Sequence, residues 1–411
     1  MRNIYSSIDI GTDEIKIVVM EYFNDKYNVL ASSSVKSFGV KQGLIVDASL
    51  VTSSIKKCVK QVESKLGTKL EKLIAVVPSN NIEITIGSSS TNVDTMNNII
   101  DGDTIFKGMQ KCLKDSADSS LEVVGVFPIE YIINKNKKVN NPLGLEGTNL
   151  SMKCIIASVP RKNVYSVVSV IESLGIEVVD ILISSIGDYY VAKNRELDSK
   201  VVGCINIGKE KSVLSIFNKG IIVKEEVVKL GFDKIIEDIV FNYKTDEEET
   251  LKIIKDFAVA NRKYADSDEI YTSTNRNGEK IDINNYKLAE LIEYRIVELL
   301  KNIKNQINNL TNKEIGYIII TGGITSMLGF NAIVSELYSK NVSVLNTGVI
   351  GIRDNKYITC YGAIKYFVDK LNLREKEYTM FSNEKVEEII VNGKKMGNSS
   401  VLGKIFDRIF D

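Results

Sequence analysis

The residues best suited to do chemistry lie close to the start of the chain. An apolar, β-branched run from Ile4 to Ile10 ends at Gly11, and a second such run continues from Ile15 to Met20. A tight turn built on Gly11 leaves backbone N–H groups pointing outward, and such a turn is a natural cradle for a phosphate. The sequence therefore predicts a strand–turn–strand unit that could hold a phosphate.

Three side chains at this turn have matching chemistry. Asp9 ends the first strand, where a carboxylate could hold Mg²⁺ through its water ligands. Thr12 follows the glycine, and Lys16 could reach a phosphate as a point charge. An ordinary hairpin with a surface lysine is the simpler explanation of this segment taken alone, because short glycine turns are common. The rest of the sequence must decide between the two explanations.

Composition narrows the chemistry available to the 411-residue chain. Lysine plus arginine equals aspartate plus glutamate at 53 each, so no overall basic field would attract nucleic acid. The chain has no histidine, which excludes Ser-His-Asp and Cys-His catalysis and imidazole metal sites. The five cysteines show no C-x-x-C spacing and are expected to be buried, reduced thiols of a cytoplasmic protein.

Two later glycine turns could face the first one. A second strand–turn–strand unit centres on Gly208, so the chain contains a half-length repeat. Another buried strand ends at Thr321, Gly322 and Gly323, where the backbone could approach an adenosine closely. Two α/β halves that each offer a turn would grip the two sides of a polyphosphate. The spacing favours an ATP-binding cleft of the actin, sugar-kinase or chaperone type.

The elements that must position these turns form an α/β body with two insertions. Asp47 is predicted to cap an amphipathic helix of the first lobe, and residues 265–285 are expected to form a polar loop. The predicted ranges are 1–80 for the first lobe (completed by 160–190 and 345–373), 81–159 for an inserted α+β subdomain, 191–230 for the second lobe (completed by 310–344) and 231–309 for a helical nucleotide- or partner-binding subdomain.

The end of the chain has a different character. Residues 374–398 are polar and are predicted to form a flexible linker, and residues 399–411 an amphipathic helix. That helix would be roughly 16 Å long, too short to cross a bilayer but suited to lie in its interface. Docking on a partner or on the chain's own body are the alternatives. The apolar residues of the helix, which share one face, are Val401, Leu402, Ile405, Phe406, Ile409 and Phe410.

Taken together, these motifs resemble FtsA, the actin-like bacterial cell-division family that tethers the tubulin-like FtsZ ring to the membrane. The segment from Ile8 to Thr12, with Lys16, is similar to the first phosphate loop of that family. The terminal helix is similar to the family's membrane-targeting element. Other segments that resemble family motifs are Gln42–Asp47, Phe127–Tyr131, Asn141–Leu145 and, as the adenosine loop, Thr321–Gly323.

The resemblance carries expectations about fold and function. It implies an actin-like, ribonuclease H-like fold of two lobes, with ATP and Mg²⁺ as cofactors and Asp9 near the metal. It also implies self-association into filaments at the cytoplasmic face of the membrane, at the division site. Glu249 and Lys252 fall where the family has residues near the ribose and adenine. Arg295 is a candidate to bind the acidic C-terminal peptide of an FtsZ-type partner, although an exposed helix arginine without that role is equally consistent.

The second glycine turn departs from the family's pattern, Asp-Ile-Gly-Gly-Gly-Thr-Thr-Asp. The Asp that would order Mg²⁺ and the attacking water is the neutral Asn206 here. Lys209 and Glu210 replace two flexible glycines, so close approach of the backbone to a phosphate is not expected. Lys211 could partly substitute as a cation. The sequence therefore predicts weakened nucleotide binding with little or no hydrolysis, and no catalytic residue is assigned.

Three functions remain open at this point. The leading hypothesis is a membrane-tethered, actin-like scaffold of the division ring. A pilus-assembly actin homologue, which binds a partner's peptide without touching lipid, shares the fold, but the terminal helix argues against it. An actin-fold ATPase or kinase needs a catalytic carboxylate in the second turn, and Asn206 argues against that function.

Overall fold

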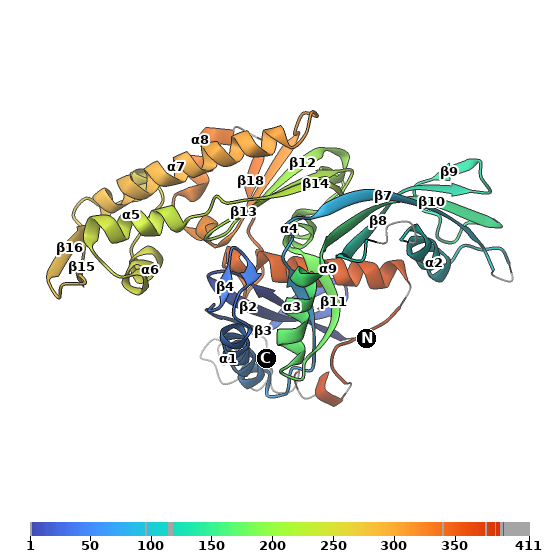
Figure 1. Cartoon of the computed structure of the whole chain (residues 1–411), viewed down its shortest axis with the longest axis horizontal. Helices are drawn as coiled ribbons and strands as arrows, with labels where there is room; N and C mark the ends of the chain where they lie inside the picture. The colour runs from blue at the N-terminus through green and yellow to red at the C-terminus, as the bar shows by residue number, and fades with distance from the viewer. Residues whose placement is uncertain are drawn as a thin grey trace, which may run out of the picture.

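Two five-stranded sheets, one in each lobe, form the centre of this computed structural model (Figure 1). The structure describes residues 2–94, 97–113, 118–338, 341–374, 376–382, 384–386 and 389. The first sheet, ordered β11-β6-β1-β2-β3, contains β1 (Asn3–Ile10), β2 (Glu14–Phe23), β3 (Lys26–Lys36), β6 (Lys72–Val77) and β11 (Glu177–Ile183). The second, ordered β14-β13-β12-β17-β18, contains β12 (Val201–Ile207), β13 (Ser212–Asn218), β14 (Ile221–Val228), β17 (Tyr317–Thr321) and β18 (Val342–Val344).

The two sheets repeat one topology. In each sheet three consecutive strands pair antiparallel, and the first of them pairs parallel with a later strand. The turn after the first strand repeats as well. Gly11 donates its N–H to the carbonyl of Glu14 at 3.0 Å, and Gly208 donates to the carbonyl of Lys211 at 2.9 Å. The half-length repeat and the two-lobed actin-like fold that it predicts are confirmed.

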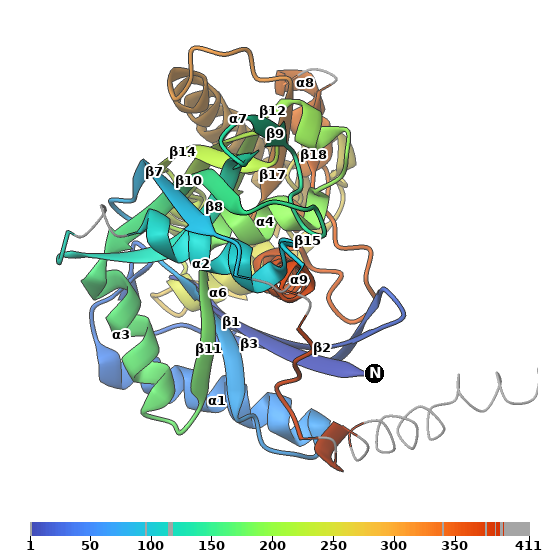
Figure 2. The ribbon, with the colours of Figure 1, turned by 90° about the vertical axis from the view of Figure 1, so that its right-hand side faces the viewer.

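Two helices lie between the sheets (Figures 1 and 2). Helix α9 (Ile358–Leu373) packs on the first sheet, α4 (Ser184–Ala192) packs on the second, and the two helices pack on each other. They cross at Gly187 and Gly362, where a Cβ on Gly362 would lie 1.7 Å from the carbonyl oxygen of Gly187. The crossing is therefore a backbone-to-backbone contact that joins the two lobes.

Helices α1 (Ala48–Leu66) and α3 (Arg161–Glu172) cover the outer face of the first sheet. As predicted, Asp47 caps α1, because its carboxylate accepts the N–H of Leu50 at 3.0 Å. The apolar side chains of α1, spaced three or four residues apart, are buried against the sheet. Two short strands, β4 (Val40–Lys41) and β5 (Leu44–Ile45), form the hairpin that precedes this helix.

Two further units project at opposite ends of the molecule (Figure 1). The inserted unit has its own apolar cluster under one helix, and consists of β7 (Glu83–Asn92), α2 (Gly102–Cys112), β8 (Leu121–Ile133), β9 (Lys137–Val139) and β10 (Asn149–Pro160). The other is mainly helical, and consists of α5 (Asp233–Tyr243), α6 (Glu247–Asp256), β15 (Ile270–Thr274), β16 (Lys280–Asn284), α7 (Asn285–Asn309) and, beside α7, α8 (Phe330–Tyr338).

The structure corrects two predictions from the sequence. Residues 265–285 are not a polar loop, because β15 and β16 pair as a hairpin within them. The flexible linker predicted from residue 374 is also wrong for its first part. Met380 and Phe381 are buried in the core of the first lobe, and Met380 donates its N–H to the carbonyl of Ile4 at 3.0 Å. Apolar side chains within a polar composition anchor this segment.

The predicted terminal helix, residues 399–411, lies outside the described residues, as do its six apolar side chains. Within the part of the chain that is described, no helix is both long enough and apolar enough to cross a membrane. The five cysteines are buried and form no disulfide.

Candidate functional site

The predicted turns come together where the two lobes meet. The turn after β1 places Thr12 against the β4–β5 hairpin, because the hydroxyl of Thr12 accepts the N–H of Gly43 at 2.9 Å. The turn after β12 reaches the same place from the other lobe, with Lys211 beside Gly43. Gly322, which has a φ of +115°, lies against the carbonyl of Ile207 at the end of β12. We refer to this meeting point as the lobe junction.

In the first turn, Asp9 and Lys16 form an ion pair across the β1–β2 ladder, with 2.6 Å between Oδ2 and Nζ. Both side chains are largely buried. Burial alone would lower the pKa of Lys16, but the attraction of the Asp9 carboxylate outweighs it and holds that pKa above its usual value. Lys16 is therefore charged, and Asp9 already has a cation. The magnesium role of Asp9 stays a prediction that must compete with this ion pair.

In the second turn, three consecutive charged side chains cross to the first lobe or to α6. Lys209 lies 2.6 Å from a carboxylate oxygen of Glu247 and 3.9 Å from one of Asp13. The Glu210 carboxylate accepts the N–H of Gln42 at 2.6 Å, and Lys211 donates to the side-chain oxygen of Asn80 at 2.8 Å. These contacts occupy the side of the turn that faces the first lobe.

A buried carboxylate that the sequence analysis did not single out lies at the ends of β12 and β17, next to the lobe junction. Asp188, on α4, is fully buried and accepts three hydrogen bonds, from Asn206 at 2.6 Å, Thr321 at 2.9 Å and Thr359 at 2.6 Å. The donors come from β12, β17 and the start of α9. Burial raises the pKa of Asp188 to about 6, although the three donors oppose the rise. Asn206 is therefore a donor to a carboxylate where the FtsA pattern has a carboxylate of its own.

Sequence reasoning missed Asp188 because it lies in a segment for which no helix was predicted. Its only local signal is a charged residue in the otherwise uncharged run from Ser184 to Ala192. A charge in such a run is a clue to a buried, hydrogen-bonded group.

The residues predicted near the ribose and adenine lie on α6. Glu249 accepts hydrogen bonds from Ser273 at 2.6 Å and Tyr271 at 3.2 Å, and Lys252 lies 3.5 Å from it. The hydroxyl donors of the β15–β16 hairpin hold the pKa of Glu249 below its usual value. These contacts tie α6 to the hairpin. A nucleotide role for Glu249 and Lys252 stays a prediction, as does one for Gly322 and Gly323.

Arg295 lies on α7, away from the lobe junction. It donates to both oxygens of Asp238 on α5, at 3.1 Å for the Nη2 contact, and to Glu298 at 2.7 Å. Two aromatic residues next to these groups are exposed, Tyr294 at 67% and Phe241 at 82%. Tyr294 precedes Arg295, and Phe241 lies three residues after Asp238 on the same helix. We call these four residues, Asp238, Phe241, Tyr294 and Arg295, the α5–α7 patch.

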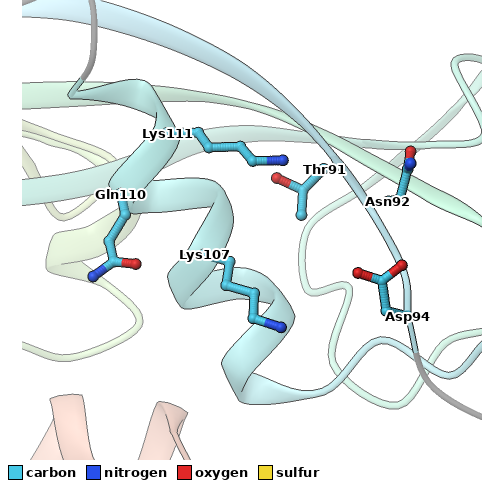
Figure 3. A pocket seen from close by; sticks show the side chains of 6 residues that line it. All are labelled: Thr91, Asn92, Asp94, Lys107, Gln110 and Lys111. Atoms are coloured by element: carbon cyan, nitrogen blue, oxygen red, sulfur yellow. The ribbon is translucent and has the colours of Figure 1, made fainter.

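A cavity of about 300 Å³ lies elsewhere, between β7 and α2 of the inserted unit (Figure 3). Its lining is polar and consists of Thr91, Asn92, Asp94, Lys107, Gln110 and Lys111. None of the residues predicted as functional contributes to it. The described residues also hold no group of three or more cysteines and carboxylates arranged to bind a metal ion.

The cofactors that the resemblance implies do not fit the junction as it stands. A phosphate between the two glycine turns would meet the side chains of Lys209, Glu210 and Lys211, which already bind protein groups. Asp9, the carboxylate predicted to lie near the metal, is paired with Lys16. We therefore route no chemical step through ATP or Mg²⁺ in this chain.

Comparison with solved structures supports an actin-like fold for this chain. A chain of the PilM-PilN type IV pilus biogenesis complex has a TM-score of 0.59 at 12% identity, over 90% of this chain and 99% of that one. MreB5 of Spiroplasma citri, solved bound to ADP, has a TM-score of 0.55 at 12% identity, over 91% and 99%. At these identities the likeness concerns the fold alone, and the fold is actin-like.

Comparison of sequences is more specific. A family model described as cell division protein FtsA matches residues 203–362, and one described as the SHS2 domain inserted in FTSA matches residues 81–158. FtsA of Bacillus subtilis (strain 168) is 26% identical over 95% of this chain and 90% of its own length. FtsA of Enterococcus faecalis is 22% identical over 99% of each. The resemblance to FtsA is confirmed, and the homologues support an actin-like cell-division protein.

Proposed function

We propose that this chain is a scaffold of cell division that tethers FtsZ-type filaments to the cytoplasmic membrane. The observation that carries the proposal is the actin-like body with the FtsA-type unit inserted at residues 81–158. Two parts of the chain divide the task. The α5–α7 patch holds the partner's C-terminal peptide, and the terminal residues 399–411 hold the membrane. Self-association of the body would multiply both contacts at the division site.

The α5–α7 patch has the chemistry to bind an acidic peptide. Arg295 already binds a carboxylate in the two-pronged geometry that guanidinium groups favour, through Asp238. These groups are partly exposed, so a carboxylate of the peptide can replace one internal partner with little desolvation. Phe241 and Tyr294 offer an apolar surface next to that charge, as expected of a peptide-binding anchor.

Replacing Arg295 with alanine is expected to weaken binding of an FtsZ-type C-terminal peptide by at least about tenfold, because a charge-assisted hydrogen bond contributes roughly 1.5–3 kcal/mol. Fluorescence anisotropy with a labelled peptide measures the change. Arg262→Ala is the matched control, since Arg262 also lies near two glutamates, Glu290 and Glu293, and is partly exposed. Equal effects of the two substitutions would count against the α5–α7 patch.

The membrane contact is proposed from the sequence pattern of residues 399–411. Six apolar side chains share one face of the predicted helix, and charged ones share the other. Each large apolar side chain contributes at most about 1.5–3 kcal/mol when buried, and ordering a free peptide opposes that gain. One tail is therefore a weak anchor, whereas an assembly that carries many tails binds strongly.

The double substitution Ile405→Glu and Phe406→Glu is expected to reduce co-sedimentation with phosphatidylglycerol–phosphatidylethanolamine vesicles by at least about tenfold. Each change places a charge on the face that would enter the bilayer. Asp407→Asn, on the polar face, is the control and should leave sedimentation unchanged. If the full-length protein and a chain lacking residues 399–411 co-sediment equally with vesicles, the proposal that these residues bind the membrane is wrong.

A further inference from the structure

The second glycine turn carries three charged residues in a row, and all three of their charged ends reach across the lobe junction. We propose that Lys209, Glu210 and Lys211 form an internal clamp that holds the two lobes together and keeps nucleoside triphosphates out. In this chain, side chains of the protein would connect the two lobes at the place where a polyphosphate could otherwise connect them. The inference goes beyond the proposed tether and does not depend on it.

The clamp makes a separate contact at each residue. Lys209 lies 3.9 Å from Asp13, which is part of the first glycine turn, and pairs with Glu247 at 2.6 Å. Glu210 accepts the backbone N–H of Gln42 at 2.6 Å. Lys211 donates to Asn80, just after β6, at 2.8 Å. Three points of the first lobe are thus held by one turn of the second.

The first lobe is shaped to receive this turn. Gly43, with a φ of +72°, lies so close to Lys211 that a Cβ there would be 2.4 Å from the lysine Nζ. Only glycine leaves that space without strain at this backbone conformation. Burial at the junction also lowers the pKa of Lys211 to about 8, although the attraction of Glu225 and Asp9 opposes the shift. Lys211 therefore fills a place in the junction and is not a freely solvated side chain.

The backbone of the turn is fixed from behind. Phe232 donates its N–H to the carbonyl of Gly208 at 3.2 Å, and Asp233 donates to the carbonyl of Lys209 at 2.9 Å. Gly231 packs against the same carbonyl, where a Cβ would lie only 2.0 Å away. The start of α5 thus anchors the turn, so the clamp cannot move aside without disturbing α5.

A triphosphate would have to displace these contacts. Its negative charge would be repelled by the carboxylate of Glu210. The backbone N–H groups that could bind it belong to a turn crowded by the side chains of Lys209 and Glu210. Displacing Lys209 would also remove the cation that Glu247 and Asp13 share. The clamp residues therefore favour contacts within the protein over binding of a triphosphate at the lobe junction.

The test restores both glycines in the full-length chain, as Lys209→Gly with Glu210→Gly. Tm is measured by scanning calorimetry without ligand and with about 1 mM Mg-ATP, a concentration at which a micromolar site would add clear stability. We expect the wild-type Tm to change by less than about 1 °C with Mg-ATP. We expect the variant to melt at least about 3 °C lower without ligand, and to regain stability when Mg-ATP is added.

Lys219→Gly is the matched control, because Lys219 is an exposed lysine with a φ of +54° in the hairpin turn after β13, and glycine suits that conformation. It should neither lower Tm nor create a response to Mg-ATP. A wild-type Tm that rises by several degrees with Mg-ATP would overturn the proposal, and this measurement needs no variant to fold. An unchanged Tm in the double variant, or one that does not respond to Mg-ATP, would overturn it too.

Discussion

Replacing Gly362 with alanine is expected to destabilise the protein by at least about 3 kcal/mol, which is more than a surface substitution costs. In the interior of a helix, glycine to alanine ordinarily stabilises by about 0.5–1 kcal/mol. The sign of the effect is therefore diagnostic. Here the added methyl group would lie 1.7 Å from the carbonyl oxygen of Gly187 and 2.8 Å from its Cα.

The clash cannot be relieved by a side chain, because both partners are backbone. On the other helix, a Cβ on Gly187 would lie 2.8 Å from the carbonyl oxygen of Thr359. Neither helix therefore has room for an added methyl group at the crossing. Helix α9 packs on the first sheet and α4 packs on the second. Separating the two helices therefore separates the lobes, and the loss of packing extends beyond the crossing itself.

Urea unfolding followed by circular dichroism measures the effect of Gly362→Ala. The control is Gly316→Ala, since a Cβ there has its nearest neighbour at an ordinary 3.5 Å and the backbone has no positive φ. The control should change the free energy of unfolding by no more than about 1 kcal/mol. If the two alanines have the same effect, the α4–α9 contact is looser than the structure indicates.

How far the sequence predicts this fold depends on whether the signal is local. The glycine turns at Gly11 and Gly208 were recognisable because a β-branched run, a glycine and a second run form one short segment. Asp47 was recognisable as a cap for the same reason. In each case the residues that decide the conformation are neighbours in the chain.

The remaining features depend on partners distant in the chain. The alternation of Ile281 and Ile283 in β16 is short and surrounded by polar residues, so the hairpin was predicted as a loop. Met380 and Phe381 dock on β1, almost the whole chain away, and no periodicity shows that contact. From the sequence, the charged residues 209–211 are only a departure from the phosphate-loop pattern. Their contacts with the other lobe become visible only in the structure.

Asp188 leads to the second large effect. Asp188→Ala is expected to lower the free energy of unfolding at pH 7 by about 3 kcal/mol or more, because three buried donors lose their acceptor. Those donors belong to β12, β17 and the start of α9, so the loss falls on the contact between the second sheet and the central helices. Leu345→Ala, a core substitution near the end of β18, reports the cost of an uncharged cavity for comparison.

The pH dependence separates the carboxylate from a simple loss of packing. The pKa of Asp188 is raised to about 6 in the folded protein, chiefly by burial, whereas an unfolded aspartate titrates near 3.9. A raised carboxyl pKa means that the folded state binds the proton more tightly. The contribution is most favourable below the unfolded pKa and is lost as pH rises through the folded pKa. The stability difference between wild type and Asp188→Ala should therefore widen by on the order of 2 kcal/mol from pH 7 to pH 4.

Measuring that difference at each pH cancels the titration of the other carboxylates, which both proteins share. The double substitution Asp188→Asn with Asn206→Asp offers a second check, because it exchanges donor and acceptor within the same 2.6 Å contact. It should recover part of the stability that Asp188→Asn loses alone. A difference that narrows on acidification would mean that the three donors outweigh burial, and that Asp188 titrates below its ordinary pKa.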